Sequence, residues 1–435
     1  MAIVEFFLRR LIRKGHLRII EANGSVMDLG GGPGPKVTVQ FHDQSLLFKL
    51  AQDFTLHLGE AYMDGRVTIK EGTLYDLLEL FAINWDDGPT MPWEVVDEFF
   101  SPLTRLIQRN TPEVSRKNVA HHYDLSPNLF KLFLDTDLQY SCAYFTDPGN
   151  DLHSAQFDKK RLIAAKLLLK KGMRVLDIGC GFGGLALYLA KTYGVEVTGI
   201  TLSEEQYKVA VERAKQEGLT ELAKFHLRDY RKETERYDRV VSIAMFEAVG
   251  VRHFKEFFAQ VKALLKDDGV ALVHSIGRKD GPGPSDNWIR KYIFPGGYAP
   301  SLSEVLPILE KAELWVTDIE VLRLHYVNTL RCWRTNFEHN RQAIRQLYDE
   351  RFCRMWEFYL VFCEMLFKHL SLMVFQIQLA KNINAVPITR DYIFKEMSRL
   401  GSVQIPESST VFGGTSEPVN SFASQTTAAN AVPAK

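Results

Sequence analysis

One stretch of the chain, residues 174–206, most constrains what it can fold into. It reads RVLDIGCGFGGLALYLAKTYGVEVTGITLSEEQ, in which two short apolar runs flank a glycine-rich turn and an apolar helical pattern. Glycine lets the backbone turn sharply and lets a ligand approach it without a Cβ between them. The pattern predicts a βαβ unit with its glycine turn at the carboxyl end of the first strand. Open α/β sheets bind nucleotide-like ligands at that place.

The spacing of the glycines distinguishes two kinds of nucleotide-binding turn. A dinucleotide fold favours G-x-G-x-x-G, with an acidic residue about 20 positions later. This chain instead has Gly179, Gly181 and Gly183 at alternate positions, preceded by Asp177. The pattern resembles the first motif of the class I S-adenosylmethionine-dependent methyltransferases. NAD binding and a tight turn without a ligand are the alternatives.

Length and composition limit the class of protein. The 435 residues favour two domains and a tail. Lys and Arg number 53, as do Asp and Glu, so no strongly basic character argues for a nucleic-acid partner. Five cysteines without metal-type spacing indicate reduced thiols in the cytoplasm. No apolar run is long enough to span a bilayer, so we expect any membrane contact to be peripheral.

Residues 1–95 predict a small α+β domain that contacts lipid, followed by a linker at 96–115. Residues 2–20 open this domain with a basic amphipathic pattern, in which an apolar stripe lies largely opposite Arg9, Arg10, Arg13 and Lys14. Such a helix can lie on an anionic membrane surface, or its stripe can pack on its own domain. Alternating runs at 36–41 and 66–69 predict strands in the same domain.

The rest of the chain divides into a catalytic domain at 116–400 and a tail at 401–435. The tail is rich in small and polar residues, which predicts disorder. Residues 335–383 carry an apolar pattern interpreted as helical. His121 and His122 are adjacent and lack further ligands at normal spacing, so we predict no metal site.

Several motifs occur in an order that resembles the cyclopropane-fatty-acyl-phospholipid synthase family and the related mycolic acid cyclopropane synthases. The resemblance covers about residues 116–395 and rests on HHYDLS, FLD, YSCAYF, VLDIGCGFGG, GITLSEEQ, FEAVG and HSIG. It implies an α/β class I methyltransferase fold, Rossmann-like with a seven-stranded sheet. It also implies transfer of a methylene group from S-adenosylmethionine to the cis double bond of an unsaturated acyl chain in a membrane phospholipid. The product would be a cyclopropane ring.

The resemblance and the glycine turn together assign ten contacts to S-adenosylmethionine. These are Tyr140, Ser141, Asp177, Gly179, Gly181, Gly183, Thr201, Leu202, Gln206 and Tyr230.

The resemblance also implies a bound bicarbonate ion as the base that closes the ring. Its expected contacts are Cys142, Glu247, His274, Ile276 and Tyr326, with Glu247 orienting His274. Aromatic faces stabilise cations, which gives Tyr326, Phe246 and Tyr140 a role beside the carbocation. Cys142 as a covalent nucleophile is the alternative.

The expected partner is an unsaturated phospholipid, reached from the cytoplasm by peripheral association with the inner face of the membrane. A lipid C-methyltransferase that makes methyl- or methylene-branched chains remains the alternative function. The sequence leaves double-bond position, headgroup preference and oligomeric state open, with a homodimer as one option.

Overall fold

The computed structural model describes residues 2–85 and 125–401. The predicted linker, His121, His122 and the predicted tail beyond Gly401 lie outside the described residues. The domain boundaries therefore remain predictions.

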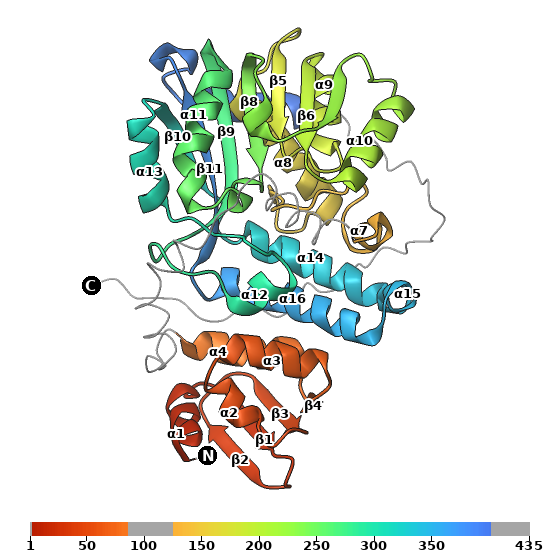
Figure 1. The fold of residues 1–435 in the computed structure, drawn as a ribbon, viewed down its shortest axis with the longest axis vertical. Helices are drawn as coiled ribbons and strands as arrows, with labels where there is room; N and C mark the ends of the chain where they lie inside the picture. Colours follow the sequence, from red (N-terminus) through yellow and green to blue (C-terminus); the bar gives the residue numbers. More distant parts are fainter. Residues whose placement is uncertain (1, 86–124, 402–435) are drawn as a thin grey trace, which may run out of the picture. The chain divides into compact units, whose positions relative to one another are not determined.

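The N-terminal part, residues 2–85, is a small α+β fold (Figure 1). Its sheet has the order β2-β1-β3-β4, in which β1 and β3 are parallel and the other neighbours antiparallel. Its elements are α1 (Ala2–Leu11), β1 (His16–Ile20), β2 (Val26–Gly30), β3 (Lys36–Phe41), α2 (Leu46–Leu50), α3 (Phe54–Met63), β4 (Val67–Glu71) and α4 (Leu74–Trp85).

The opening helix α1 packs on its own domain. Leu8 and Leu11 are buried in the core that the N-terminal sheet and helices share. The helix ends before Arg13 and Lys14, whose backbone N–H groups donate to Oδ1 of Asn84 at 3.0 and 2.9 Å. Much of the predicted apolar stripe is therefore used internally, while the basic side chains are exposed.

Within residues 125–401 the centre is a seven-stranded sheet of order β10-β11-β9-β8-β5-β6-β7. The strands β7, β6, β5, β8 and β9 are parallel, and β11 is antiparallel to both of its neighbours. This arrangement confirms the predicted class I fold. The bounds are β5 (Arg174–Ile178), β6 (Glu196–Thr201), β7 (Ala223–Leu227), β8 (Tyr237–Ile243), β9 (Leu265–Arg278), β10 (Trp315–Val321) and β11 (Leu372–Ala380).

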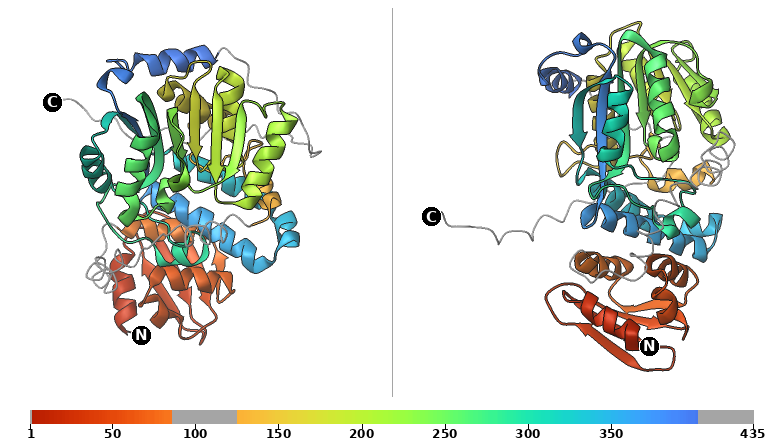
Figure 2. Two further views of the ribbon diagram at one scale, coloured as in Figure 1. Left: turned by 45° about the horizontal axis from the view of Figure 1, so that its top comes forward. Right: turned by 60° about the vertical axis from the view of Figure 1, so that its left-hand side comes forward.

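Helices cover both faces of this sheet (Figure 2). One core joins the sheet to α8, α9 and α10, and another joins it to α11 and α13. The α-helices are α7 (Pro127–Phe133), α8 (Leu152–Leu167), α9 (Gly184–Tyr193), α10 (Glu204–Gln216), α11 (Phe254–Leu264), α12 (Asn287–Tyr292), α13 (Leu302–Lys311), α14 (His325–His339), α15 (Arg341–Leu347), α16 (Glu350–Lys368) and α17 (Asp391–Gly401). The short 3-10 helices are η1 (Tyr230–Lys232), η2 (Phe246–Ala248), η3 (Val251–His253) and η4 (Ile383–Ala385).

The prediction that residues 335–383 are helical is wrong at its end. Residues 372–380 form β11, which pairs with β9 on one side and β10 on the other. A strand buried on both faces reads as a continuous apolar run, which periodicity alone does not separate from a buried helix. The pairing with two neighbours decides the structure here.

Helices α14 and α16 connect the two parts of the chain. One hydrophobic core includes Leu58 of α3, Leu78 of α4, Leu330 of α14 and Phe358 of α16. Helix α16 packs against both α3 and α4. The N-terminal fold is thus packed against the helices that precede β11.

Candidate active site

Two cavities open at the carboxyl ends of the parallel strands. The smaller has a volume of about 170 Å³ and the larger about 560 Å³. Tyr140, Ala244 and Ala248 line both. Since the two cavities share these wall residues, ligands bound in each would meet at this junction.

The smaller cavity is built around the glycine turn. Nine of the ten predicted cofactor contacts line it: Tyr140, Ser141, Asp177, Gly179, Gly181, Thr201, Leu202, Gln206 and Tyr230. Gly181 has a φ of +55°, and a Cβ added there would meet no atom within 4 Å. The turn therefore keeps open space directly against its backbone, which a ligand can fill.

Gly183 has a different place from the one predicted. It does not line the smaller cavity, and it caps the N-terminus of α9 with a φ of +83°. A Cβ there would lie 2.9 Å from Ala210 and Phe225. The alternate spacing did not reveal this difference, because all three glycines need positive φ.

Two side chains hold the far wall of the smaller cavity in place. The Thr201 hydroxyl donates to Oε1 of Gln206 at 2.9 Å, and Ser203 accepts from the Gln206 N–H at 3.2 Å. Ser203 thereby caps α10. The end of β6 and the start of α10 are thus fixed around the cavity.

Asp177 is an unpaired buried carboxyl in the same wall. It is 1% exposed, and its Oδ2 has no hydrogen-bond partner among the described residues. Burial raises the pKa of this carboxyl to about 7. An orphaned acceptor of this kind is satisfied when a bound ligand supplies a donor.

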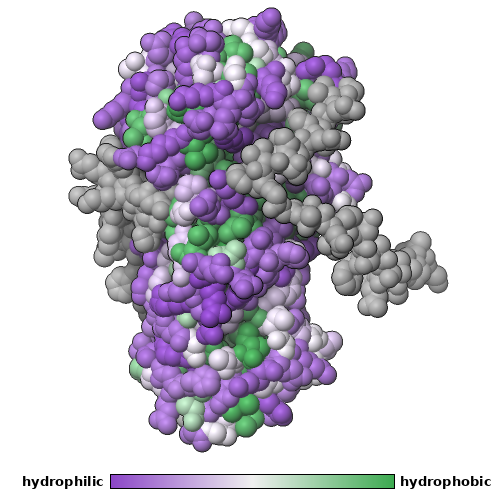
Figure 3. All heavy atoms as spheres, turned by 90° about the vertical axis from the view of Figure 1, so that its right-hand side faces the viewer, coloured by the Kyte–Doolittle hydropathy of each residue, from purple (hydrophilic) through white to green (hydrophobic). Residues whose placement is uncertain are grey.

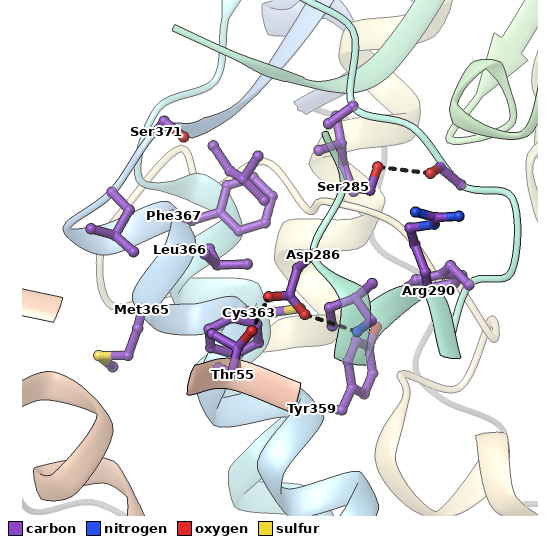
Figure 4. Close-up of a pocket in the computed structure, with 18 of the residues that line it drawn as sticks. Thr55, Ser285, Asp286, Arg290, Tyr359, Cys363, Met365, Leu366, Phe367 and Ser371 are labelled. Carbon is purple, nitrogen blue, oxygen red and sulfur yellow. Dashed lines mark hydrogen bonds between the residues drawn. The ribbon is translucent and has the colours of Figure 1, made fainter. Parts of the chain in front are cut away.

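The larger cavity is mostly apolar and is enclosed by several elements. Figure 4 shows Tyr359, Cys363, Leu366 and Phe367 of α16 around it. Helices α3 and α4 add Phe54, Leu58, Leu78, Phe81 and Trp85. The segment 281–300, whose Gly/Pro-rich sequence resembles a lid, contributes α12.

A polar contact joins the N-terminal part to this segment. Asp286, just before α12, accepts a 2.6 Å hydrogen bond from the hydroxyl of Thr55 on α3 (Figure 4). Trp288 of α12 is fully buried. In this structure the segment is a packed part of the cavity wall.

Three of the five predicted catalytic residues line the larger cavity: Glu247, Ile276 and Tyr326. Oε1 of Glu247 accepts from the Ile276 N–H at 2.5 Å, and its Oε2 has no partner among the described residues. Burial raises the pKa of Glu247 to about 7, so both its protonated and charged forms exist near neutral pH.

His274 is not placed as predicted. It lies inside β9, four residues before its end, and its Nδ1 is 3.2 Å from Nε2 of Gln376 on β11. It lines neither cavity, and its carboxylate partner Glu247 binds Ile276 instead. Burial lowers the His274 pKa to about 3, which keeps the ring neutral. Strand β9 continues beyond His274 to Arg278, and the role of His274 at a bicarbonate ion stays a prediction.

Cys142 also lies outside both cavities and is 1% exposed. Burial raises the pKa of its thiol well above the usual range, so it is protonated at neutral pH. Because the thiolate is the reactive form, this environment argues against the nucleophile alternative.

Phe246 points away from the chemistry. Its ring stacks on Phe254 with centroids 4.4 Å apart, within the core under α11, and it lines neither cavity. Tyr359, by contrast, lines the larger cavity. Its hydroxyl lies 2.8 Å from that of Tyr140, at the junction side of the larger cavity. In the sequence, Tyr359 is one residue of the apolar pattern at 335–383, and nothing local singles it out.

Lys159 is a second residue that the sequence reasoning missed. It lines the smaller cavity and is completely buried. It stands in the charged run Asp158–Arg161, which is typical of an exposed helix face. No local pattern therefore distinguished it.

Comparison with known proteins identifies the family. The family model of mycolic acid cyclopropane synthetase matches residues 110–377, more than half of the chain. The chain belongs to the mycolic acid cyclopropane synthetase family. A second model, a domain of unknown function, matches residues 8–86.

Members of the family and related enzymes are similar over most of their length. A cyclopropane-fatty-acyl-phospholipid synthase of Escherichia coli K12 is 37% identical over 346 residues, covering 79% of this chain and 87% of that protein. A probable fatty acid methyltransferase of Pseudomonas putida is 35% identical, covering 81% and 88%. A solved mycolic acid cyclopropane synthase complexed with SAH and CTAB has a TM-score of 0.58 and 32% identity, covering 61% and 97%. The chain is therefore an S-adenosylmethionine-dependent methyltransferase, and the predicted family is confirmed.

The smaller cavity fits the cofactor of this family on chemical grounds. S-adenosylmethionine ends in an amino acid with one ammonium and one carboxylate group. The cavity wall offers the orphaned Oδ2 of Asp177 and the buried ammonium of Lys159. The open space beside the Gly181 backbone can take the remaining part of S-adenosylmethionine.

The arrangement does not fit the predicted bicarbonate cradle. Cys142 and His274 lie outside the cavity, and the Ile276 N–H is already donated to Glu247. A charged Glu247 would also repel an anion. Among residues 2–85 and 125–401, no cluster of three or more His, Cys, Asp or Glu side chains could hold a metal ion.

Proposed function

We propose that the protein transfers a methylene group from S-adenosylmethionine to the cis double bond of an unsaturated acyl chain of a membrane phospholipid. The product is a cyclopropane ring. The observation that carries this proposal is the junction of the cavity at the glycine turn with a large apolar cavity at Tyr140, Ala244 and Ala248.

The apolar cavity supplies the binding energy for the acyl chain. S-adenosylmethionine, when bound, supplies an electrophilic methyl group. Each buried CH₂ group contributes roughly 0.8 kcal/mol of binding free energy. Contact with the walls that α3, α4 and α16 form therefore offsets the free energy that the acyl chain loses when it leaves the bilayer. Binding along these walls places a mid-chain double bond at the junction.

Aromatic side chains at the junction stabilise the carbocation that forms after methyl transfer. Tyr140, Tyr326 and Tyr359 line this part of the larger cavity. Each aromatic face near a cation contributes about 0.5–2 kcal/mol. The apolar walls also exclude water, which would otherwise add to the cation.

Glu247 is the residue placed to accept the proton that ring closure releases. The new methyl group loses a proton, and the electron pair of that C–H bond forms the third side of the ring. Oε2 of Glu247 takes the proton, because its Oε1 is held by the Ile276 N–H. Bicarbonate as the proton acceptor remains a prediction; removing carbonate from the assay should lower the rate if it holds.

Membrane contact is part of the proposal. No described helix is long and apolar enough to cross a membrane. The face in Figure 3 is largely hydrophilic, with apolar surface in separate patches. The protein would act peripherally at the inner face from the cytoplasm, where exposed Arg9, Arg10, Arg13 and Lys14 attract anionic lipid.

Sedimentation with vesicles tests the electrostatic part. Binding to vesicles that contain anionic lipid should weaken as salt is added, because ions screen exposed charges. Changing the four basic residues to Gln should remove most of that salt-dependent binding. Equal sedimentation of this variant and the wild type would contradict the electrostatic attraction.

The second candidate is a lipid C-methyltransferase with a branched product. The probable fatty acid methyltransferase relative favours it, and the same cation leads to either outcome. Mass spectrometry of lipids from cells that express the chain decides between them. A gain of one CH₂ with loss of the double bond supports the ring. A retained double bond, or two further hydrogens, would support a branched chain.

A further inference from the structure

Lys159 is a buried ammonium group without a counter-ion in contact. Its side chain is 0% exposed, and no carboxylate of the described residues lies within ion-pair distance of it. Lysine is almost never fully buried unless it is paired. Lys160 and Lys166 on the same helix are paired, with Asp137 and with Asp318 and Glu320. The unpaired ammonium in the cavity wall thus fits an anionic ligand group.

The hydrogen bonds of Lys159 determine which of its neighbouring groups donate and which accept. Its Nζ donates to Oε1 of Gln139 at 2.7 Å and to Oγ of Ser141 at 2.8 Å. Gln139 in turn donates to Asp137 at 3.0 Å. Because the Ser141 oxygen accepts from an ammonium, its own hydroxyl proton is available to a further acceptor. Ser141 lines the smaller cavity, so that acceptor can be a ligand.

Several charged groups surround Lys159. Burial lowers its pKa to about 8, and Asp135 and Asp137 oppose that effect while Lys160 adds to it. Asp177 and His274 also experience its charge. A ligand carboxylate would hold Lys159 in its charged form.

We propose that Lys159 is a positioning residue for the amino-acid end of the cofactor, turning the Ser141 hydroxyl into a donor to its carboxylate. Asp177, in the wall of the same cavity, receives the ammonium group of that end. This inference rests on the assignment of the smaller cavity to S-adenosylmethionine.

Calorimetry with two ligands tests the proposal. S-adenosylhomocysteine carries the amino-acid end, whereas 5′-methylthioadenosine has the same adenosine and thioether without it. In the full chain, Lys159→Met should lower the affinity for S-adenosylhomocysteine at least about tenfold, as expected for a lost charge-assisted hydrogen bond. The affinity for 5′-methylthioadenosine should stay within about twofold. Equal weakening of both ligands, or of neither, would overturn the proposal.

Lys166→Met is the matched control. It removes another fully buried ammonium from α8, but one that lines neither cavity. Both affinities should stay at the wild-type level even if stability falls. If Lys166→Met changed the ratio of the two affinities as much as Lys159→Met does, the effect would not depend on the position of Lys159. That result would contradict the proposal.

A pH series on the wild type needs no variant to fold. The affinity for S-adenosylhomocysteine relative to 5′-methylthioadenosine should fall about twofold from about pH 7 to about pH 8.5. Loss of the proton from Lys159, whose pKa is about 8, lowers the ratio about fourfold, and ionisation of Asp177, whose pKa is about 7, raises it about twofold. A flat ratio would overturn the role of Lys159. A wild type that binds neither ligand would overturn the cofactor assignment itself.

Discussion

Burial controls the charge of Glu247, the carboxyl group that faces the larger cavity. With a pKa raised to about 7, it holds its proton in weak acid and becomes a base only as pH rises through neutrality. The polar link to Ile276 fixes its orientation. In the proposed mechanism, this one residue therefore sets how the reaction depends on pH.

We predict that turnover rises with pH through about 7 and that Glu247→Gln removes this rise. The variant keeps the shape but cannot accept a proton, so kcat should fall at least about 100-fold. Cofactor affinity, measured by calorimetry, should change little. Glu364→Gln, which alters another buried carboxyl outside both cavities, should keep the rise. A rise that persists in Glu247→Gln would assign the base to another group, such as bicarbonate.

At the scale of elements, the turn between β5 and α9 combines backbone angles that favour glycine with open space beside Gly181. Gly179 and Gly181 have φ values of +79° and +55°, which L-residues adopt at a cost. The same conformation brings bare backbone to the cavity. Packing of α9 depends instead on Gly183, so neighbouring glycines serve the ligand and the fold separately.

Gly181→Ala and Gly172→Ala form a matched pair that separates the two effects. Both glycines have positive φ, and a Cβ at either meets no atom within 4 Å. Each change should cost about 1–2 kcal/mol of unfolding free energy. Only Gly181→Ala should lower the affinity for S-adenosylhomocysteine, by at least about tenfold, because the methyl group of the new alanine enters the cavity. Denaturant titration and calorimetry measure the two effects, and equal cofactor affinity in both variants would remove the turn from the site.

At the scale of the whole molecule, both parts of the chain line the larger cavity. Gly59 of α3 lies against α12 and α16, where any Cβ would overlap Trp288 and lie 3.0 Å from Phe358. Hydrogen bonds from Thr55 to Asp286 and from Tyr62 to Glu357 connect the same surfaces. The domain of unknown function thus forms one wall of the larger cavity.

We therefore predict that Gly59→Leu impairs lipid modification without affecting cofactor binding. Leucine suits a helix, but overpacking at this contact should cost about 1–3 kcal/mol. Activity on phospholipid vesicles should fall at least about tenfold, with S-adenosylhomocysteine affinity unchanged in calorimetry. Gly24→Ala, at a turn of the same domain where a Cβ meets nothing within 4 Å, should leave activity near that of the wild type. Full activity of Gly59→Leu would show that this wall is not needed.

The sequence by itself determined the features that depend on residues close together along the chain. The order of strand, glycine turn and helix predicted the βαβ unit, because local backbone preference and hydrophobic period specify it. The same stretch, with the family motifs, predicted nine residues that line the smaller cavity. Seven of these positions lie at or just after the ends of β5, β6 and β7, which a parallel sheet brings to one edge, whereas Tyr140 and Ser141 lie in the loop between α7 and α8.

Only the tertiary structure decided which side chains face a cavity. His274 and Cys142 carry reactive groups, yet β11 and the surrounding core bury them away from both cavities. Lys159 stands in a charged run, yet the fold places it against the Gln139–Ser141 loop. Burial and pKa arise from contacts between residues far apart in the chain, such as Glu247 with Ile276 and Thr55 with Asp286. Local sequence patterns do not specify such contacts.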